Sequence, residues 1–431
     1  MKPSGRLGGS LQLPRTPGST LPSSPSSVQP VKPTPLFAIP DYRRGWFYGM
    51  LTGVARWLEF LALGIFAYQL TESPPLVALL GILRLVPYFT LGYLVGSVTD
   101  KIDRKLWLLI ALVAMCAISG TMAYLAATGE ATYTTIVIAT LATGVFWLTD
   151  MPFRRRFMLD AVGSDRAGRA MGFDNITNYA TRGLGPLIGG VVFQFFGPVG
   201  VFGVNLGVYV LCFIVALGFQ RQRPAKAVPE VASEPKEPNA RPTLQGSLLS
   251  DARFCIILAV TVLYNLFCIP FVAMLPVFAQ KDFGLQPAAV GTLAAFEGVG
   301  GFVGSIVVGL LIRPPAFFIV YFCGPLIYLC AVLTLSFALT PGFTLVALIV
   351  LSFGGACFSA TQYTLIYTTA APELRGRAFG FLSMAIGCGT LGLWNAGYLF
   401  NTFPSATAMQ IMALEGLVPM LLLALYAAIR R

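Results

Sequence analysis

Histidine, the side chain that most often titrates near neutral pH and most often binds metal ions, is absent from the sequence. Its absence excludes histidine-dependent catalytic triads and leaves carboxylates as the groups able to carry a proton. The eight cysteines lie inside apolar runs without a Cys-x-x-Cys pair, so we expect neither a disulfide framework nor a metal site. The phosphate-binding pattern Gly-x-x-x-x-Gly-Lys-Ser/Thr is also missing, so we expect no ATP-driven pump, no enzymatic activity and no cofactor.

Charged residues are scarce as well. They make up 11% of the 431 residues, against about 25% in a typical soluble domain, whereas 56% of the residues are hydrophobic. A water-soluble core cannot hide so much apolar sequence, so the chain belongs in a lipid bilayer. At about 20 residues for each span, there is room for roughly twelve spans. The net charge of +11 does not indicate a nucleic-acid partner, because the basic residues gather in short loops and in the two ends of the chain.

The hydrophobic pattern predicts an all-helical membrane protein with twelve transmembrane helices in two halves of six. We expect a disordered basic tail (1–43), an N-terminal six-helix bundle (44–219), a hydrophilic linker (220–250) and a C-terminal six-helix bundle (251–431). The expected spans are 44–70, 75–97, 106–127, 132–152, 172–196, 199–219, 252–279, 288–312, 316–339, 343–370, 378–402 and 406–428.

Basic residues alternate between successive loops. The loops that follow even-numbered spans carry Lys and Arg, as do both ends of the chain, whereas the other loops contain a single base, Lys281. Because short basic loops stay in the cytoplasm, the sequence predicts a multi-pass protein of the cell (inner) membrane with both termini cytoplasmic.

An internal repeat supports the division into halves. The segment 168–173 (GRAMGF) recurs as 376–381 (GRAFGF), and Gly96 recurs as Gly304 at the same offset. Repeats that each contain an even number of spans keep the same orientation in the membrane. We therefore expect the substrate path to run between the halves.

The segment 96–105 (GSVTDKIDRK), between the second and third spans, resembles the loop between helices 2 and 3 of the major facilitator superfamily. The resemblance implies an alternating-access transporter of a small molecule. It also implies that the acid of this loop faces two arginines at the start of the eleventh span and closes an inner gate. The alternative is that these charges only fix the topology. The gating residues are Gly96, Asp100, Lys101, Arg104, Lys105, Arg375 and Arg377.

The fifth span contains the segment 185–190 (GPLIGG), which resembles a Gly-Pro-x-x-Gly-Gly signature of exporting, antiporter branches. Glycines let a neighbouring helix approach closely and proline bends the helix, so plain helix packing is the alternative explanation. Together with Asp150 and the arginines after it, the signature resembles the branch of enterobactin exporters and macrolide-efflux proteins. The matching residues are Gly172, Gly185, Pro186, Gly189 and Gly190.

Several ionisable residues lie inside the expected spans, where each is costly unless it is paired or hydrated, so a functional role is the default hypothesis. Counting from the loops places Glu59, Arg84, Arg182 and Glu297 near mid-depth, where they would share one wet cavity. Arg56, three residues before Glu59, would alternatively neutralise it. Glu415 is a weaker candidate, because the twelfth span is peripheral in this superfamily. The polar groups expected to join the cavity are Asn178, Asn265, Gln362 and Asn395.

The sequence therefore predicts a monomeric secondary active exporter of a small organic molecule, coupled to protons through Glu59 or Glu297. Cavity arginines favour an anionic substrate, whereas an aromatic wall favours an apolar one. An importer or facilitator, and a non-transporting receptor or scaffold, are the alternatives. The aromatic candidates are Phe66, Trp147, Tyr179, Tyr264, Phe296, Tyr363 and Trp394.

Overall fold

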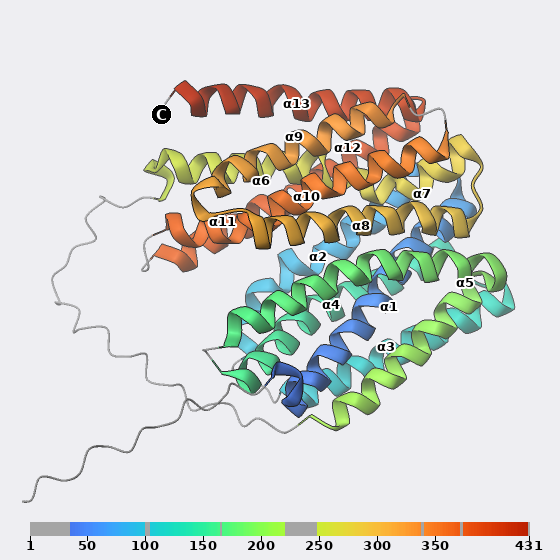
Figure 1. The fold of residues 1–431 in the computed structure, drawn as a ribbon. Helices are drawn as coiled ribbons and strands as arrows, with labels where there is room; N and C mark the ends of the chain where they lie inside the picture. The colour runs from blue at the N-terminus through green and yellow to red at the C-terminus, as the bar shows by residue number, and fades with distance from the viewer. Residues whose placement is uncertain are drawn as a thin grey trace, which may run out of the picture. The chain divides into compact units, whose positions relative to one another are not determined.

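The computed structural model describes residues 35–99, 104–163, 166–219, 248–337, 340–370 and 374–429. All regular elements in these ranges are helices, and no strand occurs among the described residues (Figure 1). We call residues 36–219 the first half and residues 248–429 the second half.

The first half contains α1 (Pro40–Thr71), α2 (Pro74–Thr99), α3 (Arg104–Thr128), α4 (Tyr133–Val162) and α5 (Ala167–Leu217). The second half contains α6 (Ala252–Phe267), α7 (Ile269–Phe283), α8 (Pro287–Leu311), α9 (Phe317–Leu335), α10 (Pro341–Thr369), α11 (Arg375–Gly387), α12 (Gly389–Thr402) and α13 (Ser405–Ile429). Short 3-10 turns precede α1, α6 and α9, at Leu36–Ala38, Leu248–Ser250 and Pro314–Ala316.

Local sequence signals set where the helices begin and end. Pro40 and Pro287 occupy the first turns of α1 and α8, where the missing N–H of proline has no intrahelical partner to lose. The Asp251 carboxylate caps α6 by accepting a hydrogen bond from the Arg253 N–H at 2.8 Å. Gly284, with a φ of 57°, ends α7 in the left-handed conformation that glycine adopts without strain.

Helix α5 is long enough to cross a membrane twice. Its 51 residues would span about 75 Å if straight, more than twice the hydrocarbon thickness. The helix is interrupted at Gly197, which has φ 59° and ψ −162°. Two hydrogen bonds show that both ends of α5 lie beside the start of α1. The Tyr42 hydroxyl donates to the Ala170 carbonyl, and the Arg44 guanidinium donates to the Gly218 carbonyl. The chain therefore reverses at Gly197, where the sequence separates the fifth and sixth expected spans (Figure 1).

Nine helices among the described residues are long and apolar enough to cross a membrane, with α6 and α7 counted as one. The second crossing of α5, together with α2 and the α11–α12 pair, would complete the set. The number twelve itself stays a prediction.

The two halves meet along α5 and α8, which run antiparallel (Figure 1). A Cβ atom added at Gly298 would lie 2.4 Å from the Gly183 Cα, and one added at Gly190 would lie 2.8 Å from the Gly291 Cα. These backbones touch because no side chain separates them. We call the end of the bundle where α1 begins the terminal end, and the opposite end the far end.

Candidate functional site

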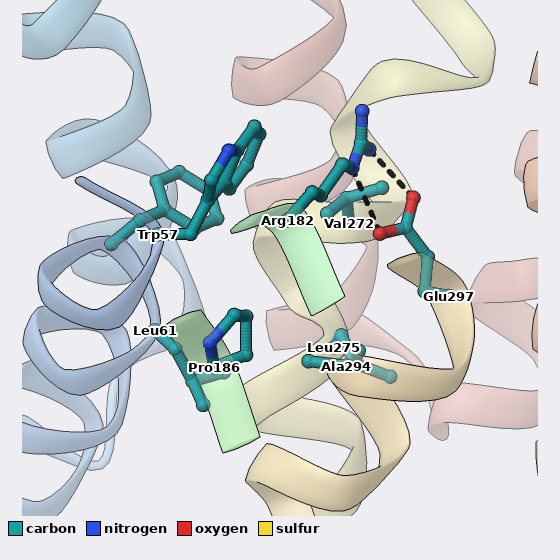
Figure 2. Close-up of a pocket in the computed structure, with 9 residues that line it drawn as sticks. Trp57, Leu61, Arg182, Pro186, Val272, Leu275, Ala294 and Glu297 are labelled. Atoms are coloured by element: carbon teal, nitrogen blue, oxygen red, sulfur yellow. Dashed lines mark hydrogen bonds and ion pairs between the residues drawn. The ribbon is translucent and has the colours of Figure 1, made fainter. Parts of the chain in front are cut away.

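An ion pair between Arg182 on α5 and Glu297 on α8 joins the two halves beside the glycine contact. The Arg182 Nε and Nη2 atoms donate to the two oxygens of Glu297 at 2.9 Å and 2.6 Å (Figure 2). The Glu297 side chain is 5% exposed and the Arg182 side chain 21% exposed. A two-point pair of this kind fixes orientation as well as charge.

Two further side chains hold this pair in place. The Ser352 hydroxyl on α10 donates to the Glu297 carboxylate at 3.2 Å. The Trp57 ring on α1 lies beside the Arg182 guanidinium, with the guanidinium carbon 4.8 Å from the ring centroid (Figure 2). The indole attracts the cation without adding charge to the site.

A polar cavity of about 200 Å³ lies on the terminal-end side of the pair. Its wall includes the ion pair itself, the tyrosines at positions 179, 264, 328 and 363, and the amides Asn265 and Gln362. Both amide groups donate to Thr261 on α6, through its carbonyl and its hydroxyl oxygen respectively. Tyr179 and Ser359 form a hydrogen bond of 2.5 Å across the cavity, from α5 to α10.

The space on the far-end side of the same pair is small and apolar. It holds about 20 Å³, roughly the volume of one water molecule. Pro186, Val272, Leu275 and Ala294 line it together with Leu61 (Figure 2). The Arg182–Glu297 pair therefore lies between a polar cavity and a nearly closed apolar constriction.

A second cluster of charges lies inside the first half. Glu59 on α1 is 3% exposed and accepts hydrogen bonds from Asn205 and Tyr209 on α5, each at 3.3 Å. Arg84 on α2 is the positive charge that acts on this carboxylate. Arg84 also lies over the rings of Phe60 and Trp147, at 5.0 Å and 4.3 Å.

Asp150, at the centre of the same cluster, is fully buried. The Arg56 guanidinium contacts its carboxylate at 3.3 Å, and the Tyr48 hydroxyl donates to it at 2.8 Å. The Arg56 guanidinium carbon also lies 5.0 Å from the centroid of the Trp147 ring, which Arg84 contacts as well. Two arginines, two carboxylates and a shared indole thus form a neutral, packed network.

Two expectations need correction. Glu59, Arg84, Arg182 and Glu297 do not share one cavity, because the Trp57 and Phe60 rings of α1, 5.8 Å apart, lie between the two pairs. Arg56 forms its ion pair with Asp150 on α4, at 3.3 Å, and not with Glu59 on its own helix.

The predicted polar groups are divided as well. Asn265 and Gln362 line the cavity, whereas Asn178 does not and contributes only its backbone carbonyl, which accepts from Thr181. Asn395 donates instead to Glu415 at 2.7 Å on the exposed side of α12 and α13. Of the aromatic candidates, Tyr179, Tyr264 and Tyr363 line the cavity, Trp147 lies in the first-half network, and Trp394 is 71% exposed.

The glycines of the Gly-Pro-x-x-Gly-Gly segment on α5 contact two different neighbouring helices. Gly185 and Gly189 lie against α1, where added Cβ atoms would be 2.8 Å from the Val54 carbonyl oxygen and 3.0 Å from the Leu58 carbonyl oxygen. Gly190 lies against α8, and Pro186 borders the apolar constriction. Among the described residues, no atom lies within 4 Å of a Cβ added at Gly172, so none of them explains this glycine by packing.

Most of the predicted gate lies outside what the structure describes. Asp100 and Lys101 fall outside the described residues, and the side chains of Arg104, Arg375 and Arg377 do too, whereas the Gly96 backbone belongs to α2. Lys105 is described, and its ammonium group donates to the carbonyls of Leu217 and Phe219, both at 2.7 Å.

Sequence reasoning missed Asp150 as a site residue, although an acid inside an apolar run was a usable signal. It also missed Arg154 and Asp174, whose ion pair joins α4 to α5 near the terminal end. Trp57, Ser352 and Tyr328 gave no signal in the sequence, because aromatic and hydroxyl side chains are common in such helices. Only the spatial arrangement identifies them.

A bundle of membrane-length helices in two halves, with a charged pair and a polar cavity between them, is the architecture of a membrane transporter. The chain belongs to the Major Facilitator Superfamily, whose sequence profile matches residues 45–428. This membership confirms the predicted fold class, and it places the chain among multi-pass membrane transporters, which are not enzymes.

Individual relatives are distant. YfiS of Bacillus subtilis (strain 168), an uncharacterized MFS-type transporter, is 22% identical over 360 residues, which cover 81% of this chain and 84% of YfiS. The crystal structure of the nucleoside transporter NupG matches with a TM-score of 0.66 at 14% identity, covering 89% of this chain and 97% of NupG. An inward-facing bacterial homolog of the human lysosomal transporter Spinster matches with a TM-score of 0.63 at 12% identity, covering 92% and 96%. Such low identities show the fold alone.

Proposed function

We propose that this chain is a proton-coupled secondary active transporter of a small organic molecule, working by alternating access at the Arg182–Glu297 pair. One observation carries the proposal: a buried ion pair joins the halves between a polar cavity and an apolar constriction. Closing the cavity on one side and opening the constriction on the other would move a molecule past the pair. We further propose the cell membrane as its location, with both termini and the terminal end in the cytoplasm, as the basic loops indicate.

We assign proton binding to Glu297 and not to Glu59. Glu297 lines both the cavity and the constriction, so its carboxylate lies where the two sides of the bundle meet. Glu59 lines neither this cavity nor the constriction, and its carboxylate is enclosed by Asn205, Tyr209 and Arg84. Protonation of Glu297 would remove the charge that binds Arg182 and weaken the contact between the halves.

The experiment measures distances between spin labels without any substrate. One label pair, at Arg169 and Arg313, reports on the terminal end, and a second pair, at Glu130 and Gln286, reports on the far end; all four side chains are exposed. We expect the two distance distributions to change in opposite directions as the pH falls. Glu297→Gln should make both distributions independent of pH, whereas the matched control Glu59→Gln should retain the response. A pH response that survives in Glu297→Gln would refute the assignment.

Two directions of transport remain to be separated. Export by proton antiport, with resemblance to the enterobactin-exporter and macrolide-efflux branch, is supported by the Gly-Pro signature around Pro186. A second candidate, import of an anion together with a proton, is favoured by the pairing itself: a proton on Glu297 leaves the positive charge of Arg182 available to an anion.

Everted vesicles distinguish the two candidates. Labelled benzoate, tetraphenylphosphonium and glucose serve as anionic, cationic and neutral probes, and vesicles without the protein give the passive baseline. Accumulation of a probe driven by an acidic interior indicates export by antiport. Accumulation driven by an acidic exterior indicates co-transport with the proton, running here in the reverse of the importing direction because the membrane is inverted. Equal accumulation under both gradients would refute proton coupling.

A further inference from the structure

The cavity between the halves contains a buried hydroxyl group that lacks a partner. The Tyr328 side chain on α9 is 2% exposed and lines the cavity, and its Oη atom has no hydrogen-bond partner among the described residues. An unsatisfied buried polar group of this kind costs free energy, so such groups are rare unless something binds them. The position of Tyr328 in the cavity wall points to a ligand.

The other polar groups of the cavity show which chemistry that ligand needs. Glu297 already accepts from Arg182 through both oxygens and from Ser352 through one of them, so its acceptor capacity is largely used. Arg182 spends Nε and Nη2 on Glu297, and no described residue accepts from its Nη1. The Tyr264 hydroxyl, also in the wall, has no acceptor among the described residues either. The Arg182 guanidinium and the Tyr328 hydroxyl can therefore donate to an acceptor group of a ligand, whereas the side-chain oxygens of Asn265 and Gln362 can accept hydrogen bonds from it.

The volume of the cavity and the aromatic side chains in its wall limit the class of ligand further. A volume of about 200 Å³ lies below the range of roughly 300–1,000 Å³ of typical ligand pockets, so the ligand is compact. Tyr264 lies between the stacked ring of Phe358, at 3.9 Å, and the edge of Tyr328, at 5.8 Å. Aromatic faces and edges of this kind pack well against a ring.

We propose that the cavity beside Arg182 binds a compact organic monocarboxylate carrying one ring, with the Tyr328 hydroxyl donating to its carboxylate. This inference rests on the proposed function, because it names the substrate class of the same cavity. A cation gains little here, since the one carboxylate in the wall is already engaged. A neutral molecule would satisfy the hydroxyl but not the remaining donors of Arg182.

The proposal fixes the sign of the coupling between proton and ligand. The titratable groups that face Glu297 or line the same cavity are Arg182 and Tyr179 on α5, Tyr264 on α6, Tyr328 on α9 and Tyr363 on α10. Arginine and tyrosine ordinarily titrate far above neutral pH, and Glu297 is the carboxylate among these groups. Its protonation removes a negative charge next to the bound anion, so affinity for the anion rises as the pH falls. This sign agrees with the second candidate function.

The test uses the full-length protein in nanodiscs with labelled benzoate as the probe. Benzamide and benzylamine, which keep the ring and change only the charge, serve as competitors. We expect benzoate to bind more tightly at lower pH, benzamide to compete weakly and benzylamine not to compete. Competition by benzylamine equal to that of unlabelled benzoate, or no benzoate binding up to its solubility limit, would overturn the proposal.

Two tyrosine variants test the role of the orphan hydroxyl. Tyr328→Phe should weaken benzoate binding about tenfold or more, because a hydrogen bond to a charged group is lost, while thermal stability stays equal or rises. Tyr42→Phe is the matched control, since the Tyr42 hydroxyl is also buried but donates to the Ala170 carbonyl and lies outside the cavity wall. It should lower the melting temperature and leave benzoate affinity within about twofold, as a hydroxyl outside the wall makes no ligand contact.

Unchanged benzoate affinity in Tyr328→Phe would refute the proposal that the Tyr328 hydroxyl donates to the bound carboxylate. The proposed function is tested separately by the spin-label distances, which require no ligand. A protein that shows the pH response but binds no benzoate refutes the substrate class alone, and a protein that binds benzoate without the pH response refutes the proton-coupled mechanism alone.

Discussion

Replacing Gly298 by alanine should force α5 and α8 apart. The added Cβ would lie 2.4 Å from both the Cα and the N of Gly183 and 2.9 Å from the Arg182 carbonyl carbon. All three are backbone atoms, so no side chain can rotate out of the way. Because carbon atoms make contact at about 3.5–4.0 Å, the helices must separate locally by roughly 1 Å or more. Overpacking of this kind costs about 1–3 kcal/mol.

The matched control lies on the same helix. Gly309 has no atom within 4 Å of an added Cβ, so Gly309→Ala meets no obstacle. Alanine there removes backbone freedom from the unfolded chain and should stabilise by about 0.4–1 kcal/mol. The two substitutions are chemically identical and differ only in what the new methyl group contacts, so their effects should have opposite signs.

Thermal unfolding in nanodiscs, followed by intrinsic tryptophan fluorescence, measures both variants. We expect a lower melting temperature for Gly298→Ala and an equal or higher one for Gly309→Ala. The Arg182–Glu297 hydrogen bonds, now 2.6 and 2.9 Å, begin one residue away from this contact and should lengthen with it. Equal melting temperatures for the two variants would refute the close approach of the two backbones, and with it the account of how the pair is positioned.

Three further outcomes follow from the first half. Asp150→Asn should destabilise by about 3–5 kcal/mol, because it leaves the buried charge of Arg56 uncompensated, whereas the exposed Glu130→Gln should stay within about 0.5 kcal/mol in the same unfolding assay. Glu59→Leu should lower the melting temperature more than Glu59→Gln, since the amide oxygen still accepts from Asn205 and Tyr209; the reverse order would contradict the enclosed network. Gly197→Ala should cost about 1–3 kcal/mol because its φ is 59°, and Gly203→Ala, with open space around it, is the comparison that should cost nothing.

The architecture could be predicted from the sequence because the signals for it are local and repeated. Apolar runs mark the spans, and prolines such as Pro287 mark helix starts. The internal repeat at Gly168 and Gly376 marks the two halves. The break at Gly197 was also placed correctly, since a Gly-Pro pair between two apolar runs favours a turn.

The grouping of the buried charges could not be predicted in the same way. Depth along a helix follows from counting residues, but the facing direction depends on how each helix is rotated against its neighbours. Glu59 and Glu297 lie at similar depths, yet one faces the interior of the first half and the other faces the cavity. The orphan hydroxyl of Tyr328 is a property of its surroundings, which no sequence pattern records.

The reversal at Gly197 bears on how the far end meets its surroundings. One non-helical residue connects the two crossings of α5, so no hydrophilic loop extends from them into water. The rings of Phe195 and Phe196, 71% and 70% exposed beside it, would sink into the lipid headgroups and hold this corner at a fixed depth. A protease would find no accessible extended segment to cleave at this corner, and an epitope tag inserted there would have no loop to extend, whichever way the transporter is facing.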